Sequence, residues 1–393
     1  MVTLTTADNA LKKVYLGVVA NELNNATNPL YNKIVQSTAD VWGKNIIKLA
    51  PYGLNGGIGA GTEEGNLPAS GENKYVTLTS GLKNLYGMIE ITDKAIRASA
   101  TDAGAFVNLL NAEMEGLLNA SKFNLSRMLY GDGSGLLADV TAAVVATGLI
   151  TVSSVKNLME GIVVDFYKSG AAVTGLVGVR IESINRTAKQ IKVSAALPAD
   201  IAANPTAYKI YVQGSKDNEL TGLGAIFNTG LTSLYGVTKA NHGWMNPYAK
   251  AKGTTEAFDD MLVQTAIDEV ARNYDSVTDF MVCDSATRRA FQAYLTSQRM
   301  NLDIVELSGG YKTMSYNGIP VVSDRFAPAG TLYMLNTKDF CIHQLCDWQW
   351  LEAEDGSILK QKSGFPIYTA TLVKYADLIC SKPGGQAMLT NLV

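Results

Sequence analysis

The strongest hydrophobic repeat of the chain lies between residues 102 and 130. Apolar side chains recur there every three or four positions, which is the spacing of one face of an α-helix. The residues on this face are Phe106, Leu109, Leu110, Met114, Leu117, Leu118, Ser121, Leu125, Met128 and Leu129. Four charged residues lie mostly off it: Glu113, Glu115, Lys122 and Arg127. With Thr101 or Asp102 as the N-cap, the pattern predicts a helix roughly 43 Å long, which could cross a whole domain.

A glycine-rich stretch, "GDGSG", follows this helix at residues 131–135. It lacks the G-x-G-x-x-G spacing, the preceding strand and the Gly-Lys-Ser/Thr of phosphate-binding loops. Asp132 and Ser134 have no glutamate at the spacing of an EF-hand calcium loop, and Ser134 is not in a G-x-S-x-G context. We therefore predict a helix stop, with Gly131 at the C′ position in a left-handed conformation and Gly133 and Gly135 reversing the chain.

Segments rich in β-branched and aromatic residues predict strands in the second half of the chain. Four of them predict a small β module within residues 151–220: "GIVVDFY", "VGVRIESI", "KQIKVSA" and "AYKIYVQ". Further strands are "DFMVCD", "LDIVEL", "YKTMSY", "IPVVSD", "TLYMLN", "DFCIHQL" and "IYTATLVKYADLIC". The dipeptide Asn317-Gly318 predicts a hairpin turn between two of these strands.

Two more helices are predicted among these strands. The first covers residues 254–274, and its apolar face contains Phe258, Met261, Leu262, Thr265, Ile267 and Val270. The second runs from Ser285 to about Gln298, with Asp284 as its cap. Helices and strands alternate without a βαβ rhythm, so the fold class is α+β.

Residues 51–74 differ from the rest of the chain, since they contain seven glycines, two prolines and almost no core-forming residues. A structureless segment of this length is uncommon inside a compact domain. Strand-like stretches flank it at 45–49 and 75–78, and "GMIEIT" follows at 87–92. We expect a two-stranded finger that projects from the body. Before it lies a polar arm with a helical stretch around residues 11–23.

Composition and charge argue against some classes of function. The net charge of −3 argues against a generic nucleic-acid binder, and a charged fraction of only 18% is expected where much of the surface meets other subunits. No apolar run reaches the ~18 residues that span a bilayer, and the N-terminus lacks a signal pattern. We therefore expect a soluble protein made in the cytoplasm.

Candidate chemistry is sparse. The four cysteines (Cys283, Cys341, Cys346 and Cys380) form no C-x-x-C pair, so we expect no metal site and read them as small buried residues in a reducing compartment. Of the two histidines, His343 lies in a predicted strand and is expected to have a structural role. His242 lies in a polar and aromatic loop, and the sequence predicts no role for it.

A catalytic site built from paired carboxylates is the enzymatic alternative that is hardest to exclude. The candidates are Glu63 with Glu64, Asp259 with Asp260, and Glu352 with Glu354 and Asp355. They lie in the finger, on a helix surface and at a turn, so none is anchored as a general acid–base pair needs to be. We predict no catalytic residue and no cofactor.

The order of the elements resembles that of the major capsid proteins of tailed bacteriophages, whose fold is shared with encapsulins and the herpesvirus capsid floor. The resemblance covers nearly the whole chain. It is carried by the order and spacing of "MIEITDKAIRAS", "EMEGLLNASKFNLSRMLYGDGSGLL", "MVCDSATRRAFQAYL" and "YNGIPVVSDRFAPAGTLYMLN". It implies an N-terminal arm (1–50), an E-loop (51–92), a P domain with the spine helix (93–150), an inserted β domain (151–220), a return to the P domain (221–253), a region that is mainly A domain (254–345) and closing P-domain strands (346–393).

The same resemblance implies a non-enzymatic protein of the virion, made in the host bacterial cytoplasm, that self-assembles through hexamers and pentamers into an icosahedral head enclosing DNA. The implied partners are other copies, a portal, a possible decoration protein and packaged DNA bound only non-specifically, with no membrane. No long charged helical segment precedes the arm, so we expect either a separate scaffolding protein or an already processed chain, although the initial Met argues against processing. Some members of the family link an E-loop lysine to a neighbour's asparagine; Lys74 is the candidate here, although a solvated lysine is the better expectation. The alternatives are an encapsulin-like compartment and, less favoured, a soluble enzyme with an unrecognised carboxylate site.

Overall fold

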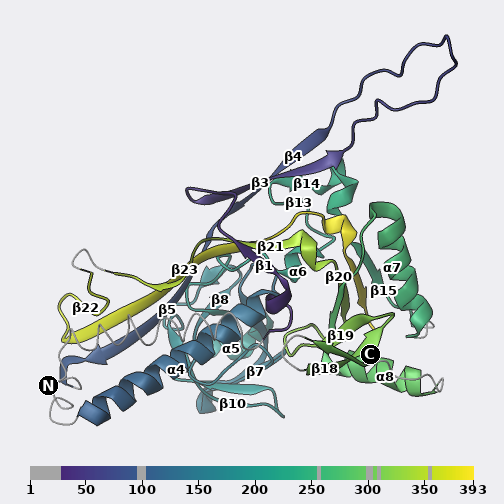
Figure 1. The fold of residues 1–393 in the computed structure, drawn as a ribbon. Coiled ribbons are helices and arrows are strands. Elements are labelled where there is room, and N and C mark those ends of the chain that lie inside the picture. The colour runs from purple at the N-terminus through teal and green to yellow at the C-terminus, as the bar shows by residue number, and fades with distance from the viewer. Residues whose placement is uncertain (1–27, 95–102, 255–257, 298–303, 308–310, 353–355) are drawn as a thin grey trace. The chain divides into compact units, whose positions relative to one another are not determined.

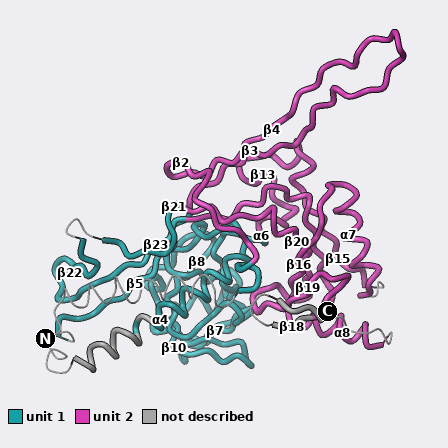
Figure 2. Tube along the Cα trace, viewed as in Figure 1, with its two compact units in different colours: residues 1–32, 83–224, 346–375 teal, residues 33–82, 225–345, 376–393 magenta. Residues whose placement is uncertain are grey.

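The computed structural model describes residues 28–94, 103–254, 258–297, 304–307, 311–352 and 356–393. Helices and strands are mixed, which confirms the α+β class (Figure 1). The described residues fall into two compact units, one within residues 28–32, 83–224 and 346–375, the other within residues 33–82, 225–345 and 376–393 (Figure 2). The predicted helix at 11–23 and the N-cap at Thr101 or Asp102 lie outside the described residues.

The first unit contains the long helix, α4 (Ala103–Met128), which confirms the strongest sequence prediction. Leu118, Leu125 and Met128 are buried, as the apolar face requires. The helix packs closely on strand β5 (Lys83–Thr92), because a Cβ atom added at Gly87 would lie 2.9 Å from the Leu117 side chain. Strand β5 also pairs with β23 (Ile367–Cys380), whose other neighbour at this end is β22 (Lys360–Gln361).

The helix stop differs in detail from the prediction. Gly131 N–H donates to the carbonyl of Met128 at 3.0 Å, and Gly131 is not among the residues with positive φ, so the predicted left-handed C′ conformation is wrong. The chain reverses at Gly133 and Gly135, with φ of 85° and 80°, as predicted. Glycines at this turn are needed for close packing as well, since a Cβ on Gly135 would lie 2.5 Å from the Ser215 carbonyl oxygen.

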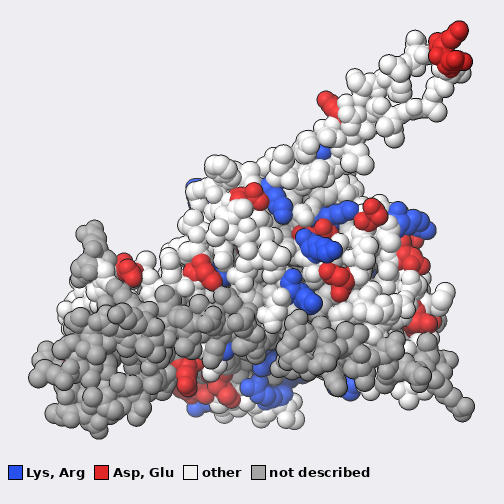
Figure 3. Space-filling model, in the orientation of Figure 1, with Lys and Arg blue, Asp and Glu red and all other residues white. Residues whose placement is uncertain are grey.

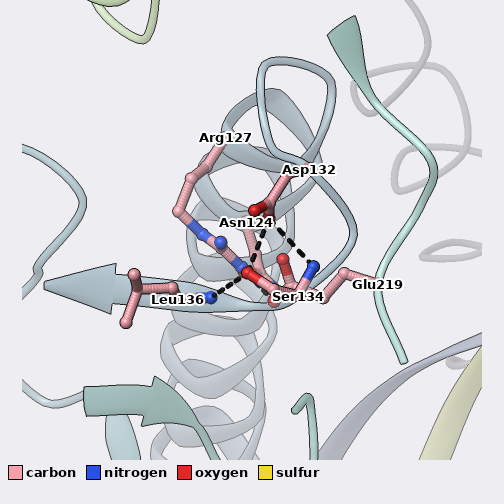
Figure 4. A network of polar contacts seen from close by, with 6 residues as sticks. All are labelled: Asn124, Arg127, Asp132, Ser134, Leu136 and Glu219. Atoms are coloured by element: carbon pink, nitrogen blue, oxygen red, sulfur yellow. Dashed lines mark hydrogen bonds and ion pairs between the residues drawn. The ribbon is translucent and has the colours of Figure 1, made fainter. Parts of the chain in front are cut away.

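The residues around this turn form a polar network (Figure 4). Ser134 donates its backbone N–H to Asp132 Oδ1 at 3.0 Å, and the Ser134 hydroxyl accepts from Leu136 N–H at 3.3 Å. Arg127, predicted to lie mostly off the apolar face, is instead buried and ion-paired with Glu219. The prediction failed because the partner that makes burial tolerable is far away in the sequence.

The β module is a sheet that closes on itself. Its strands are β6 (Leu136–Val144), β7 (Leu149–Val152), β8 (Val163–Lys168), β9 (Ala171–Ala172), β10 (Val179–Asn185), β11 (Gln190–Val193) and β12 (Tyr208–Val212). Their order is β10-β11-β7-β6-β12-β8-β9, and β10 also pairs with β8. The interior is apolar, with Phe166, Ile181 and Ile210 fully buried, and the short helix α5 (Ala199–Ala203) contributes Ile201 to the same core. The four predicted strands are present, and the sheet also includes β6 and β7, which begin before residue 151.

The second unit is built on a sheet of order β15-β24-β20-β16-β19-β18-β17. These strands are β15 (Tyr248–Ala251), β16 (Phe280–Cys283), β17 (Ile304–Leu307), β18 (Tyr311–Tyr316), β19 (Ile319–Ser323), β20 (Leu332–Leu335) and β24 (Ala387–Thr390). The turn at Asn317 and Gly318 joins β18 to β19 with φ of 48° and 78°, as the hairpin prediction requires. Smaller elements are β1 (Val35–Ser37), which pairs in parallel with β21 (Phe340–Trp350), the hairpin β13 (Ser233–Leu234) and β14 (Val237–Thr238), and α6 (Leu223–Ile226), which links the units in sequence.

Two helices pack on this sheet, α7 (Asp260–Tyr274) against β24 and α8 (Ser285–Ser297) against β19. Helix α8 is capped by Asp284, as predicted. Helix α7 starts later than predicted because the Asp259 carboxylate caps it, accepting from Leu262 N–H at 2.9 Å. Its predicted face is partly wrong. The buried residues are Leu262, Val263, Ala266 and Val270, whereas Met261 and Thr265 are exposed.

Candidate assembly surface

The predicted finger is a two-stranded ribbon that projects from the second unit (Figures 1 and 2). Strands β3 (Asn45–Gly53) and β4 (Lys74–Gly81) pair antiparallel, and the edge strand β2 (Val41–Trp42) adds to β3. The register places Ile47 opposite Thr79, Leu49 opposite Thr77 and Pro51 opposite Tyr75. Beyond Gly53 and Lys74 the chain continues as a loop without regular strands.

The two faces of this ribbon have different environments because successive side chains of a strand point to opposite faces. Ile46, Ala50 and Leu78 are buried on the inner face. The outer face carries Ile47, Leu49, Pro51, Tyr75, Thr77 and Thr79, all exposed. The ribbon therefore has an apolar residue set on each face, of which only one is covered within the chain.

The loop from Leu54 to Asn73, which we call the finger tip, exposes three more large apolar side chains. Leu54, Ile58 and Leu67 are 93%, 87% and 91% exposed. Its two arms contact each other, since Asn55 N–H donates to Asn73 Oδ1 at 2.8 Å. Its charged residues are Glu63, Glu64 and Glu72. Figure 3 shows acidic side chains at the far end of the extension, most of whose surface is uncharged. An exposed apolar set of this kind is typical of an interaction surface.

The two carboxylate pairs that the structure describes in full do not form a site. Glu63 and Glu64 are exposed in the finger tip, and Asp259 is occupied as the cap of α7. Asp260 accepts a hydrogen bond from the Tyr294 hydroxyl at 2.7 Å, which ties α7 to α8. Glu354 and Asp355 lie outside the described residues. Each described pair therefore has a structural or a solvent-exposed setting.

The histidines also have structural contacts. His343 lies in strand β21, as predicted, and is buried. Its Nδ1 lies 3.0 Å from the Ala39 carbonyl oxygen, and burial lowers the pKa of its imidazole. His242 contacts Tyr52 at the base of the finger, with ring centroids 5.2 Å apart and the rings edge to face. Nothing in the local sequence pairs these two residues, so the sequence could not reveal this contact.

The cysteines Cys283, Cys341 and Cys380 are buried as expected, whereas Cys346 is partly exposed. Burial raises the pKa of the Cys283 thiol to about 12, so it stays protonated. Within the described part of the chain, no three His, Cys, Asp or Glu residues converge as metal ligands would. Nor is any described helix both long and apolar enough to cross a membrane.

The arrangement of these elements is the fold of phage capsid shell proteins. The structure is similar to the capsid asymmetric unit of cyanophage A-1(L), with a TM-score of 0.55 at 12% identity over 96% of this chain and 92% of that one. Lower TM-scores of 0.47 and 0.45, both at 10% identity, relate it to the SrpI encapsulin of Synechococcus elongatus PCC 7942 and to the capsid of Myoviridae phage XM1. The encapsulin match covers 95% of each chain, and the XM1 match covers 92% of this chain and 90% of that one. No protein-family model and no curated protein matches the sequence.

Proposed function

We propose that this chain is the major capsid protein of a tailed bacteriophage, and that it assembles into the icosahedral head that encloses the DNA genome. The observation that carries the proposal is a finger whose outer face and tip are apolar and exposed on a chain with the phage capsid fold. Burying such surface against neighbouring copies is favourable by roughly 25 cal/mol per Å². The protein acts as a shell component rather than as an enzyme, and its location is the virion.

The domain assignments and the partners belong to the same proposal. Residues 51–92 act as the E-loop, α4 as the spine of the P domain, residues 151–220 as most of an inserted β domain and residues 254–345 mainly as the A domain. A portal, a separate scaffolding protein and a decoration protein are the other partners. Lys74, exposed at the start of β4, is a solvated lysine rather than a crosslink donor.

The test is assembly of the purified protein, followed by negative-stain electron microscopy and sedimentation. We expect closed particles, and deletion of Asn55 to Gly65 should leave a folded subunit that assembles poorly. A triple variant, Leu54→Ser, Ile58→Ser and Leu67→Ser, should assemble as poorly. The matched control is Val144→Ser with Val145→Ser, which changes exposed valines at the β6–β7 turn of the first unit.

Three outcomes would count against the proposal. Monomers at high concentration would contradict a shell protein, and normal particles from the deletion would contradict an assembly role for the finger. Particles without nucleic acid when isolated from an infected or lysogenic host would favour the encapsulin-like alternative.

On a denaturing gel, the particles should show one band at the monomer mass, because Lys74 is not crosslinked.

A further inference from the structure

Tyr235 has an unusual backbone conformation at the base of the finger. It occupies the turn of the β13–β14 hairpin with φ of 52°, followed by Gly236 with φ of 75°. Two-residue turns of this geometry favour Asn, Asp or Gly at the first central position, and a bulky side chain there is a genuine outlier. Such strain persists only where surrounding contacts over-determine the conformation.

The contacts that hold Tyr235 join two other parts of the second unit. Its side chain is buried, and the hydroxyl donates to the carbonyl of Leu378 at 3.1 Å and accepts from Cys380 N–H at 3.2 Å, both in the last residues of β23. Its own carbonyl accepts from Thr79 N–H of β4 at 2.9 Å. One strained residue therefore connects the finger strand to β23.

Two further contacts attach the base of the finger nearby. The Ser80 hydroxyl donates to Asp377 Oδ2 at 2.5 Å, and Asp377 is fully buried. On the opposite strand, the Tyr52 ring stacks on Trp244 with centroids 6.4 Å apart and also contacts His242. The ribbon is thus held to the second unit on both of its long strands. Among the described residues, no comparable attachment is present for the finger tip, whose hydrogen bonds from Asn55 N–H to Asn73 and from Gly57 N–H to Asn55 stay within the tip.

We infer that Tyr235 is a positioning residue that fixes the direction in which the finger leaves the second unit, so that the ribbon presents its outer face to a neighbouring copy in one orientation. The inference rests on the proposed function for its consequence, because only in a shell does that direction set the curvature of the product. Its structural half is independent of assembly. The hydroxyl of Tyr235 holds the β13–β14 turn on β23, and the carbonyl of the same residue holds β4 through Thr79 N–H.

The experiment compares two variants of the full chain with a matched control. Tyr235→Phe removes only the hydroxyl. Tyr235→Asn removes the ring as well and introduces asparagine, which tolerates the left-handed conformation of this turn. The control is Tyr333→Phe, which removes the hydroxyl of another buried tyrosine of the second unit, on β20. Amide hydrogen exchange of unassembled subunits is measured on peptides covering residues 75–81, and assembled particles are sized by electron microscopy.

We expect exchange at 75–81 to rise about tenfold in Tyr235→Phe, as the loss of a buried hydrogen-bond partner implies, and more in Tyr235→Asn. Tyr333→Phe should leave this segment unchanged. Both Tyr235 variants should give particles of broadened size or open sheets. Unchanged exchange in both variants, or an equal rise in the control, overturns the inference. Faster exchange with particles of wild-type size and shape also overturns it, since the direction of the finger would then not depend on Tyr235. Absence of wild-type particles would instead contradict the proposed function and leave the exchange result to decide the structural half.

Discussion

Replacing Glu219 with glutamine is expected to destabilise the first unit by about 3 kcal/mol, because the change removes the counter-charge of a buried arginine. The side chains of Arg127 and Glu219 are only 4% and 2% exposed, and they form an ion pair. Arg127 Nη2 also donates to Asn124 Oδ1 at 2.6 Å, but an amide carries no charge. Breaking a buried pair by removing one partner costs about 3 to 5 kcal/mol. Glutamine is placed at the lower end of that range because its amide oxygen can still accept a hydrogen bond.

The assay is urea denaturation of unassembled subunits followed by circular dichroism. The matched control is Glu182→Gln, since Glu182 pairs with Lys192 at 3.3 Å with both side chains nearly half exposed, at 44% and 49%. Exposed pairs contribute about 0 to 1 kcal/mol, so this variant should unfold almost as the wild type does. Arg127→Met combined with Glu219→Leu should be more stable than Glu219→Gln, because no uncompensated charge stays buried. A loss below about 1 kcal/mol for Glu219→Gln would refute the reasoning.

Two further predictions concern the first unit. A Cβ atom at Gly222 would lie 2.3 Å from the Met128 carbonyl oxygen, so Gly222→Ala should cost about 3 kcal/mol in thermal unfolding through overpacking. Gly116→Ala, on an exposed and unobstructed position of α4, should instead stabilise by about 0.5 to 1 kcal/mol, and equal shifts in the two variants would contradict this argument. Hydrogen bonds from Lys168, Tyr208 and Asn204 lower the pKa of Asp200 from 3.8 to about 2. The stability that Asp200 contributes is therefore present above pH 3.8 and lost as the pH falls towards 2. Asp200→Asn should remove that part of the pH dependence, and parallel stability curves for the two proteins between these pH values would speak against it.

Local patterns predicted the elements whose signals lie within one segment. The repeat of Leu118, Leu125 and Met128 predicted α4, and the Asn317-Gly318 dipeptide predicted its hairpin, because helix faces and two-residue turns are set by neighbours in the sequence. Features that depend on distant partners were missed or wrong. Arg127 is buried together with its ion-pair partner Glu219, 92 residues later in the sequence. Gly131 packs against Gly224, where an added Cβ would lie 2.9 Å from the Gly131 carbonyl carbon and oxygen.

The β module shows the same limit at the level of a sheet. The predicted strands were found by composition, whereas β6 contains three alanines and β7 is only four residues long, so neither gives a clear signal in its own segment. These two strands belong to the module because β6 pairs with β12 and β7 pairs with β11. Closure through β10 and β8 is likewise a property of partners that lie apart in the sequence.

The finger shows that its two strands could be predicted from the sequence, whereas the division of its side chains into a covered and an uncovered face could not. The sequence has consecutive apolar residues in β3, Ile46 and Ile47, which a half-buried strand with one solvated face would not have. In the structure, Ile46 is buried on the inner face of the ribbon and Ile47 is exposed on the outer face. A two-stranded ribbon is marginally stable by itself and needs packing to persist. The second unit supplies that packing for the inner face through Ile46 and Leu78, but nothing in the described chain covers Leu49 and Tyr75 on the outer face. A ribbon that is apolar on both sides and covered on one has the surface that the proposed contact with a second copy requires, and under the further inference its fixed base would set the side from which that copy approaches.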